Sequence, residues 1–405
     1  MEINTKTLGV EKIILTSQNI LFIQDIDGVC IPLVKDPMTR KLNKEYIFAA
    51  KKLDNEFFVL TCGEHEGERG VNRIIERSLG SKLKPKKDGL YLRGLGACGV
   101  EYQNNKGEIN IEGISKEEID FLANVPQIMR SKFRKIVKKL FPKMDDNLIN
   151  FHMNKSICDT RFSPTINFNS LFEISENNLK NIKIQRHFQK MMNEIISVGE
   201  SKGLKNSFFL HISPNLGSKN GAEIIKESNK KDIGSTDIQL LLKGAQKDAG
   251  VLCLLNKFIG DKKGKKPFGE NFNFRDVPIK KSEKIALCKK YIKPQDMPIM
   301  IGVGDTITSN KIPKSNSFSR GGSDRSFLEF IQLLGHEFGI KNSIIFVDSS
   351  YGEVFRPSTK GNDLKGITDK EDTLKFDVIF QNGPEEYRNW FTKIADKRHK
   401  IKNQI

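Results

Sequence analysis

The sequence has no long apolar run, no signal-like start and no cysteine pair. No stretch approaches the roughly 18 to 20 apolar residues that a membrane-spanning helix needs, and the first residues lack a basic segment followed by an apolar one. The 6 cysteines include no CxxC pair, and no cysteines and histidines stand at zinc-type spacing. We therefore expect a cytoplasmic protein without membrane contact, whose cysteines are free thiols in or near the core.

Acidic residues are too few to balance the basic ones. The 405 residues carry a formal net charge of +17, mostly through an excess of lysine. Such a charge makes nucleic acid or another polyanion a candidate partner. The lysine runs, however, show no clear pattern of interleaved aromatic residues, which a surface that binds single strands would need. A basic polyanion-binding protein is therefore kept as the non-enzyme alternative.

The first part of the chain predicts a parallel sheet. Apolar runs at 20–24 and 57–60 predict two strands, and a helix is expected between them at 44–53. A further helix is predicted at 71–79, followed by short strands at 89–92 and 100–102. Strand, helix and strand in this order favour a βαβ unit, in which functional residues follow the carboxyl ends of the strands.

From about residue 112 to 235 the pattern changes to basic amphipathic segments and scattered strand-like pieces. The earlier α/β alternation then returns. We expect an α/β core in two segments, 1–111 and 236–405, split by an inserted α/β domain at 112–235. The later expected elements are helices at 247–258, 327–334 and 385–395 and strands at 297–301 and 343–347.

Two motifs follow the first two predicted strands. Asp25 and Asp27 place two carboxylates at a chain reversal that ends with Gly28, although Asp and Gly are also ordinary turn residues. Thr61 and Gly63 place a hydroxyl and glycine-flanked backbone amides after the second strand. Each motif is weak when taken alone.

Two further motifs lie in the second core segment. Lys243 and Lys247 both stand near the start of a predicted helix, and the helix-opening position favours Lys247. Asp305 ends an apolar strand within Gly-Val-Gly-Asp. The residue four positions beyond it is Ser309, where an acid is common, so Asp324 is the candidate for the displaced second acid. An N-cap role for Asp324 stays equally open.

In this order the four motifs resemble the haloacid dehalogenase superfamily of phosphotransferases. The resemblance implies a Rossmann-like core with an inserted cap, and a transfer through an aspartyl-phosphate. Asp25 would then be the nucleophile, and Asp27 would exchange protons with the leaving oxygen and with water. Thr61 would hold a phosphoryl oxygen, and Lys247 would compensate charge. Mg²⁺ would bind Asp25, the Asp27 carbonyl and Asp305, with Asp324 as a further candidate ligand.

Longer segments narrow the resemblance to the glucosylglycerol 3-phosphate phosphatases, which serve compatible-solute synthesis and salt adaptation. The segments that carry it are Gln24–Cys30, Leu33–Pro37, Val59–His65, Arg69–Asn72 and Arg320–Arg325. The resemblance implies a phosphoric monoester hydrolase acting on a small sugar phosphate. A glucosylglycerol-phosphate synthase is a candidate partner, and a polyanion such as DNA is a candidate inhibitor.

Six residues are candidates for binding the substrate: Gly63, Glu64, His65, Arg69, Arg161 and His211. Arg69 could hold phosphate or pair with a neighbouring glutamate. His65 could donate to sugar hydroxyls or serve as a helix cap, and His211 fits a half-buried histidine as well as a ligand.

One further motif is dismissed. Gly94–Gly99 matches GxGxxG, but strand and turn residues follow it where a helix would be needed to bind a pyrophosphate. We therefore expect no nicotinamide cofactor. The enzymatic alternatives kept open are a sucrose- or trehalose-phosphate phosphatase and a related phosphomutase.

Overall fold

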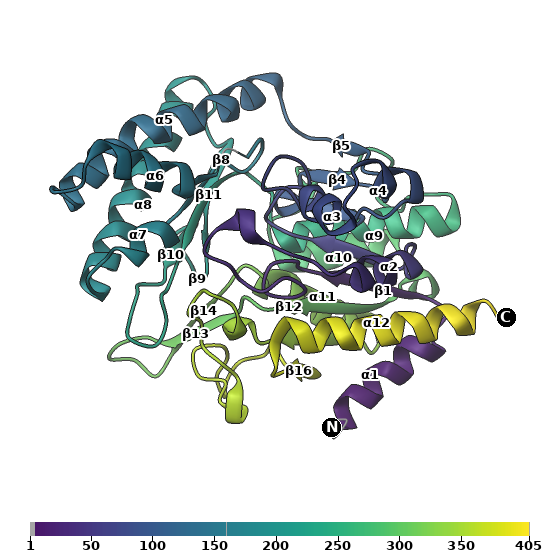
Figure 1. Ribbon diagram of the computed structural model, residues 1–405. Helices are drawn as coiled ribbons and strands as arrows, with labels where there is room; N and C mark the ends of the chain where they lie inside the picture. Colours follow the sequence, from purple (N-terminus) through teal and green to yellow (C-terminus); the bar gives the residue numbers. More distant parts are fainter. Residues whose placement is uncertain (1–4, 159, 405) are drawn as a thin grey trace.

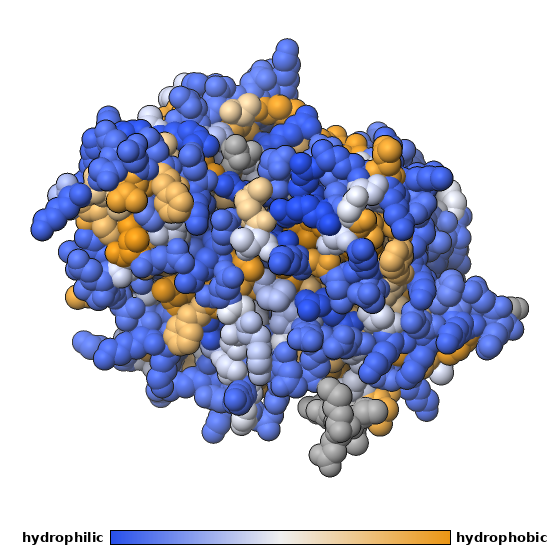
Figure 2. All heavy atoms as spheres, viewed as in Figure 1, coloured by the Kyte–Doolittle hydropathy of each residue, from blue (hydrophilic) through white to orange (hydrophobic). Residues whose placement is uncertain are grey.

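The computed structural model describes residues 5–158 and 160–404, which form two units built around separate sheets (Figure 1). A large sheet of eight strands lies in the part that carries both chain ends, and a sheet of four strands lies in the inserted part. None of the helices within these ranges is long and apolar enough to cross a membrane. Hydrophilic residues cover most of the face seen in Figure 2.

The large sheet has the strand order β16-β15-β12-β1-β2-β3-β4-β5. The strands from β16 to β3 run parallel to one another, and β4 and β5 add an antiparallel edge. The strands are β1 Ile20–Gln24, β2 Phe57–Leu60, β3 Gly94–Gly96, β4 Glu101–Gln103, β5 Ile109–Ile111, β12 Ile299–Gly304, β15 Ser343–Val347 and β16 Val378–Phe380.

Helices cover both faces of this sheet. Alternate residues of β1 point to opposite faces, so Phe22 joins one apolar core and Leu21 and Ile23 join another. Both cores exclude water, which explains why the central strands read as continuous apolar runs. The helices of one face are α1 Thr5–Thr16, α2 Lys44–Lys52, α3 Val71–Leu79 and α12 Gly383–Lys402, and those of the other are α9 Lys247–Lys263, α10 Lys281–Tyr291 and α11 Arg325–Phe338.

The inserted unit has its own core between a small sheet and a layer of helices. Its sheet has the antiparallel order β6-β7-β11-β8. Its longest helix begins with a capping box, in which Ser115 and Glu118 satisfy one another's backbone amides. The elements are α5 Lys116–Leu140, α6 Asp146–Ser156, β6 Ile157–Cys158, β7 Thr165–Asn167, α7 Asn169–Glu173, α8 Asn178–Ser201, β8 Phe208–Ser213 and β11 Asp237–Leu242.

Short elements complete the chain. Two hairpins, β9–β10 and β13–β14, lie between the units in Figure 1. In the described part of the chain, helix α4 and five 3₁₀ turns occupy the remaining connections. Their bounds are β9 Asn215–Lys219, β10 Ala222–Ile225, β13 Thr308–Lys311, β14 Phe318–Gly321, α4 Leu83–Asp88, and 3₁₀ turns at Pro37–Thr39, Ala97–Gly99, Pro294–Asp296, Ser349–Tyr351 and Lys360–Asn362.

Strand β11, which begins just after the expected boundary, bears on where the insert ends. The predicted boundary at 235 assigns β11 to the second core segment, but β11 pairs with β7 and β8 in the small sheet. Its residues Ile238, Leu240 and Leu241 belong to the apolar core of the insert. Because a strand shares the core of its sheet, we propose that the insert ends after Leu242.

The α/β fold class and most predicted elements are confirmed, but two local predictions are wrong. Residues 89–92 do not form a strand; the neighbouring strand is β3, within the segment that matches GxGxxG. Cys62 and Cys98 are not free thiols, because they form a disulfide. Sequence spacing could not show this pairing, since 36 residues separate the two cysteines and only the fold brings them together.

Candidate active site

The candidate site lies where parallel strands of the large sheet end. Asp25 follows β1, Thr61 follows β2 and Asp305 follows β12, and these three strands are neighbours in the sheet. Lys247 opens α9 beside them. Carboxyl ends of parallel strands share one edge, so residues far apart in the sequence converge there.

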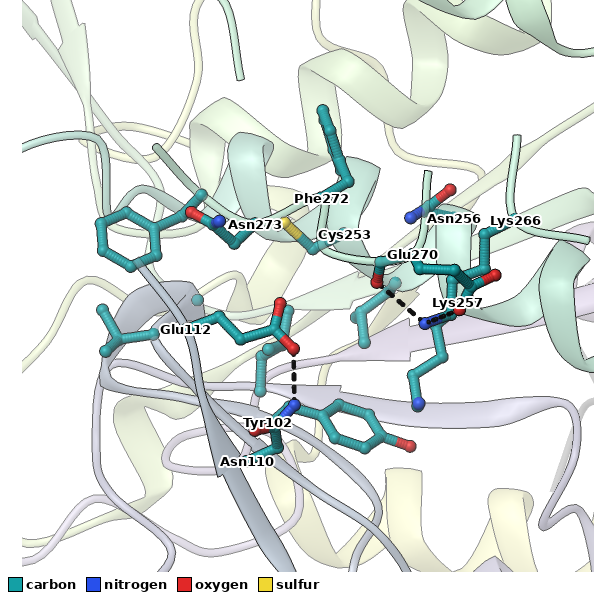
Figure 3. Close-up of a pocket in the computed structure, with 15 residues that line it drawn as sticks. Tyr102, Asn110, Glu112, Cys253, Asn256, Lys257, Lys266, Glu270, Phe272 and Asn273 are labelled. Atoms are coloured by element: carbon teal, nitrogen blue, oxygen red, sulfur yellow. Dashed lines mark hydrogen bonds and ion pairs between the residues drawn. The ribbon is translucent and has the colours of Figure 1, made fainter. Parts of the chain in front are cut away.

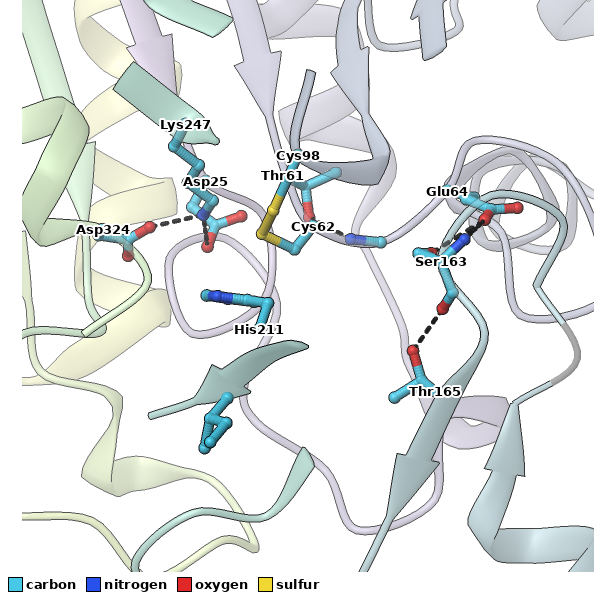
Figure 4. Close-up of a disulfide and its surroundings, with 12 residues drawn as sticks. Asp25, Thr61, Cys62, Glu64, Cys98, Ser163, Thr165, His211, Lys247 and Asp324 are labelled. Atoms are coloured by element: carbon cyan, nitrogen blue, oxygen red, sulfur yellow. Dashed lines mark hydrogen bonds and ion pairs between the residues drawn. A yellow bond between two sulfur atoms is a disulfide. The ribbon is translucent and has the colours of Figure 1, made fainter. Parts of the chain in front are cut away.

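A buried lysine joins two of the carboxylates. Lys247 Nζ lies 2.6 Å from Asp25 Oδ2 and 2.6 Å from Asp324 Oδ1 (Figure 4). Burial raises the pKa of Asp25 to about 7, although Lys247 opposes this rise. Burial alone would lower the pKa of Lys247, but the two carboxylates outweigh it and raise that pKa. The charged forms of Asp25 and Lys247 are therefore stabilised mainly by the ion pairs that Lys247 makes with Asp25 and Asp324.

The same edge provides an oxygen-rich cluster. Carboxylate oxygens of Asp25, Asp305 and Asp324 lie within 4.8 Å of one another, and all three residues are buried. Asp305 Oδ1 has no hydrogen-bond partner among the described residues. A Cβ atom added at Gly28, whose φ is +82°, would lie 2.2 Å from the Asp305 carboxylate. Hard oxygen donors, an unpaired buried oxygen and a glycine-lined approach fit Mg²⁺.

Asp324 is turned toward this cluster rather than toward its own helix. Its Oδ2 accepts hydrogen bonds from the backbone amides of Asp305, at 2.9 Å, and Thr306, at 3.0 Å. Although Asp324 precedes α11, its side chain makes no capping hydrogen bond there. The geometry therefore favours the interpretation of Asp324 as a site residue over a helix cap.

A cavity of about 200 Å³ lies over this edge, between the core and the insert. Asp27 lines it and forms an ion pair with Arg40 at 2.8 Å. Arg40 belongs to none of the four motifs and was not predicted from the sequence. The core side of the lining includes Asp25, Asp27, Arg40, Thr61, Cys62, Gly63, Glu64, Arg69, Lys247, Thr306 and Arg356.

The insert lines the other side with polar residues from two paired strands. Thr165 and Asn167 of β7 lie opposite Gln239 and Asp237 of β11. Residues two apart on a strand point to the same face, so all four side chains share one face of the small sheet. None of the four is among the residues predicted from the sequence, although the apolar–polar alternation around Ile166 and Ile238 was the available signal.

The sequence of the whole chain identifies its relatives. The family model described as glucosylglycerol-phosphate phosphatase matches residues 19–395. This chain belongs to the glucosylglycerol-phosphate phosphatase family. A curated glucosylglycerol-phosphate phosphatase from Synechocystis sp. is 37% identical over 399 residues, covering 94% of each chain. The predicted phosphoric monoester hydrolase is therefore confirmed.

Two trehalose-6-phosphate phosphatases are among the solved structures that match this chain. The C-terminal domain of the C. albicans trehalose-6-phosphate phosphatase matches with a TM-score of 0.49 and 11% identity over 97% of each chain. The Aspergillus fumigatus trehalose-6-phosphate phosphatase matches with a TM-score of 0.38 and 8% identity, over 96% of this chain and 97% of that one.

In this family member, two predicted substrate residues join the insert to the core. Glu64 accepts hydrogen bonds from the backbone amides of Arg161, Phe162 and Ser163 at 2.7 to 2.9 Å. The Arg69 guanidinium donates to the carbonyl oxygens of Ile157 and Asn154. Both residues line the cavity, so each anchors the insert beside the site.

The structure places three other predicted substrate residues elsewhere. His65 is fully buried against Gln103, and burial lowers its pKa to about 4. The Arg161 side chain is exposed, and only its backbone contacts Glu64. His211 lines a neighbouring cavity of about 830 Å³, which shares Lys247 and Ser323 with the 200 Å³ cavity. None of the three belongs to the described lining of the 200 Å³ cavity.

The geometry also separates the two candidate lysines. Lys247 reaches Asp25, whereas Lys243 is exposed and lines the 830 Å³ cavity. The helix-opening position favoured in the sequence is therefore the one that faces the carboxylates.

A third cavity, of about 80 Å³, lies between the β3–β4 edge, α9 and the segment after it (Figure 3). It is lined by residues such as Tyr102, Glu112, Lys257 and Phe272, and Lys266 pairs with Glu270 at its rim. It shares no lining residue with the carboxylate site among the described residues.

Proposed function

We propose that the chain hydrolyses glucosylglycerol 3-phosphate to glucosylglycerol and phosphate in the cytoplasm, with Mg²⁺. The observation that carries the proposal is the pairing of Asp25 with Lys247 below a cavity whose opposite wall is polar and mostly uncharged. A phosphate monoester of a polyol needs both surfaces, one for the anionic group and one for hydroxyls.

In the first step, an Asp25 carboxylate oxygen attacks phosphorus and the bond between phosphorus and the ester oxygen breaks. Asp27 donates a proton to the departing oxygen, so that the sugar alcohol leaves neutral. In the second step Asp27 takes a proton from water, the water oxygen attacks phosphorus, and the bond to Asp25 breaks. Phosphate leaves and Asp25 is restored.

The neighbouring residues position these groups. The Ile26 backbone amide donates to Asp25 Oδ1 at 2.7 Å, and Lys247 holds the other oxygen. Arg40 orients Asp27 at the cavity. Thr61 and Gly63 line the cavity, where the Gly63 amide donates to Thr61 Oγ1 at 3.2 Å, and they would hold a phosphoryl oxygen as charge develops during transfer.

Asp25, Asp305, Asp324 and the backbone carbonyl of Asp27 would hold Mg²⁺. Once bound, the ion would neutralise negative charge on the phosphoryl oxygens.

The insert would select the sugar part. Thr165, Asn167 and Gln239 offer hydroxyl and amide groups, which match the donors and acceptors of a polyol. Gln239 Oε1 is buried and has no partner among the described residues, so it is available to accept from a sugar hydroxyl.

The experiment is a phosphate-release panel over glucosylglycerol 3-phosphate, sucrose phosphate, trehalose 6-phosphate and hexose phosphates, with and without Mg²⁺. We expect the highest kcat/KM for glucosylglycerol 3-phosphate, dependence on Mg²⁺ and loss of release in Asp25→Asn. A preference for a disaccharide phosphate would overturn the substrate assignment. Return of the phosphoryl group to sugar instead of water would show a phosphomutase.

The synthase partner and the inhibitory polyanion stay predictions. A titration of the panel reaction with DNA at several salt concentrations tests the second of these, because phosphate-backbone contacts weaken steeply as salt rises.

A further inference from the structure

The disulfide beside the active site has a histidine against it. Figure 4 shows the His211 side chain beside the Cys62–Cys98 pair and near Asp25 and Lys247. Cys62 follows Thr61, Cys98 lies in the 3₁₀ turn after β3, and His211 lies on β8 of the insert. Three segments from both units therefore meet at one point.

The direction of the histidine ring is set by a carboxylate. His211 Nδ1 lies 3.0 Å from Glu223 Oε1. The other Glu223 oxygen accepts from the Ile212 amide at 2.7 Å and from Asn215 Nδ2 at 2.9 Å, so the carboxylate itself is fixed. A carboxylate that accepts from one ring nitrogen is the common support of a metal-binding histidine.

The other ring nitrogen of His211, Nε2, is available as a metal ligand. His211 Nε2 is buried and has no hydrogen-bond partner among the described residues. The Cys62 and Cys98 sulfurs and a His211 ring nitrogen lie within 4.8 Å of one another. Bonds of about 2.3 Å from Zn²⁺ to sulfur and about 2.0 Å to nitrogen, in a tetrahedron, need ligand separations of about 3.5 to 3.8 Å.

The disulfide itself cannot supply this site, because each sulfur is bonded to the other. Reduction would release two thiols, whose sulfurs would then have to separate from bonding distance to the roughly 3.8 Å that a tetrahedral Zn²⁺ site needs. Two sulfur donors and an imidazole favour a thiophilic cation, unlike the all-oxygen cluster of Asp25, Asp305 and Asp324. The two sites therefore differ in ligand chemistry as well as in residues.

Access to the site comes from both sides. Cys62 lines the 200 Å³ cavity, and Cys98 and His211 line the 830 Å³ cavity. A small reductant or a cation thus has a route to the sulfur atoms through a cavity.

We propose that, once a dithiol has reduced the disulfide, Cys62, Cys98 and His211 bind one thiophilic divalent cation such as Zn²⁺. In the reduction, two electrons and two protons pass from the dithiol to the two cysteines, and the dithiol becomes a disulfide. On binding, each cysteine loses its proton to solvent and ligates through the thiolate, and His211 ligates through Nε2. This proposal is independent of the substrate assigned above.

The test is titration of the full chain with Co²⁺ and then Zn²⁺, in its oxidised form and after reduction by a dithiol that is removed before the titration. We expect only the reduced protein to show a thiolate-to-cobalt charge-transfer band, with one equivalent bound and displaced by Zn²⁺. Absence of that band in the reduced wild type would overturn the proposal, and this readout does not depend on phosphatase activity.

Variants locate the ligands. Cys98→Ser should abolish the band, and His211→Gln should weaken Zn²⁺ binding at least 10-fold. Cys253→Ser is the matched control, because Cys253 is a free, partly buried cysteine outside the group. A band that survives Cys98→Ser, or that is lost equally in Cys253→Ser, would overturn the assignment. Thermal unfolding of each variant checks that it is folded.

Discussion

The two walls of the 200 Å³ cavity are built from different kinds of side chain. The core wall carries Asp25, Asp27, Arg40 and Lys247, whose charges are joined in ion pairs. Apart from the carboxylate of Asp237, the insert wall carries mostly hydroxyl and amide groups, and the Gln239 amide oxygen has no hydrogen-bond partner among the described residues.

The two walls would serve different parts of the reaction, the core wall phosphoryl transfer and the insert wall recognition of the sugar hydroxyls. Charged groups held in place cost little reorganisation when charge develops during phosphoryl transfer. Neutral groups with spare hydrogen-bonding capacity discriminate among hydroxyl patterns, because a mismatched ligand leaves them unpaired. Substitutions on the core wall should therefore change kcat, and those on the insert wall should change KM.

The largest effect is expected on the core wall. Asp25→Asn removes the attacking carboxylate while nearly keeping its shape, and we expect phosphate release to fall by at least about 10⁴-fold. Steady-state kinetics with glucosylglycerol 3-phosphate measures the loss, and an unchanged unfolding curve shows that the variant is folded. Retention of wild-type turnover would refute the mechanism proposed for Asp25.

The second effect separates the two lysines. Lys247→Met leaves the buried Asp25 and Asp324 carboxylates without their shared cation, so we expect a loss of about 3–5 kcal/mol in the free energy of unfolding. Turnover should fall by about 10² to 10³-fold, as expected for loss of a positioned charge. Urea unfolding and kinetics measure both effects.

Lys243→Met is the matched control for that variant, since Lys243 is exposed and four residues away. It should leave stability within about 0.5 kcal/mol of wild type, as surface substitutions usually do. Equal losses in the two variants would contradict the assignment of Lys247.

The third effect belongs to the insert wall. Gln239→Leu removes an amide that has an unpaired buried oxygen, and we expect KM for glucosylglycerol 3-phosphate to rise about 10-fold with kcat nearly unchanged. Folding should not suffer, because no protein partner of that oxygen is lost. A fall in kcat without a change in KM would contradict the proposal that the insert wall determines KM and the core wall kcat.

The smallest effect tests a buried acid behind the core wall. Burial raises the pKa of Glu101 to about 8, although the His65 amide that it accepts from opposes the rise. Between the ordinary pKa, near 4.5, and 8, the folded state therefore binds more protons than the unfolded state, and stability falls as pH rises.

Glu101→Gln removes this titration, so the variant should gain stability relative to wild type as pH rises from 5 to 8. We expect a gain on the order of 1–3 kcal/mol at pH 8 and little difference near pH 4.5. Urea unfolding across this range measures the gain. A difference that does not vary with pH would show that Glu101 does not titrate in this way.

Much of the core could be predicted because its signals are local. The runs Ile20–Gln24 and Phe57–Leu60 are apolar throughout, as strands buried on both faces must be. Asp25 and Thr61 stand directly after them, and Lys247 directly opens α9. Strand ends and helix starts are positions that a sequence can reveal without knowledge of the fold.

Other residues could not be predicted because their roles depend on contacts between distant segments. Arg40 carries no motif, and only the fold brings it to Asp27. Glu64 and Arg69 line the cavity, but the groups that they bind, on the backbone of the insert, lie about 90 residues away in the sequence. His65 was expected to donate to sugar hydroxyls or to cap a helix, and it is fully buried.

The sequence by itself determined the α/β class, the order of the four motifs and membership of the glucosylglycerol-phosphate phosphatase family, because each of these depends on local pattern or overall similarity. Tertiary structure alone decided which acids share Lys247, which insert residues face the cavity, and that Cys62 meets Cys98 beside His211. The physical reason is that these contacts join segments far apart in the sequence. They form only when the core and the insert have folded and brought their distant loops together at one edge of the large sheet.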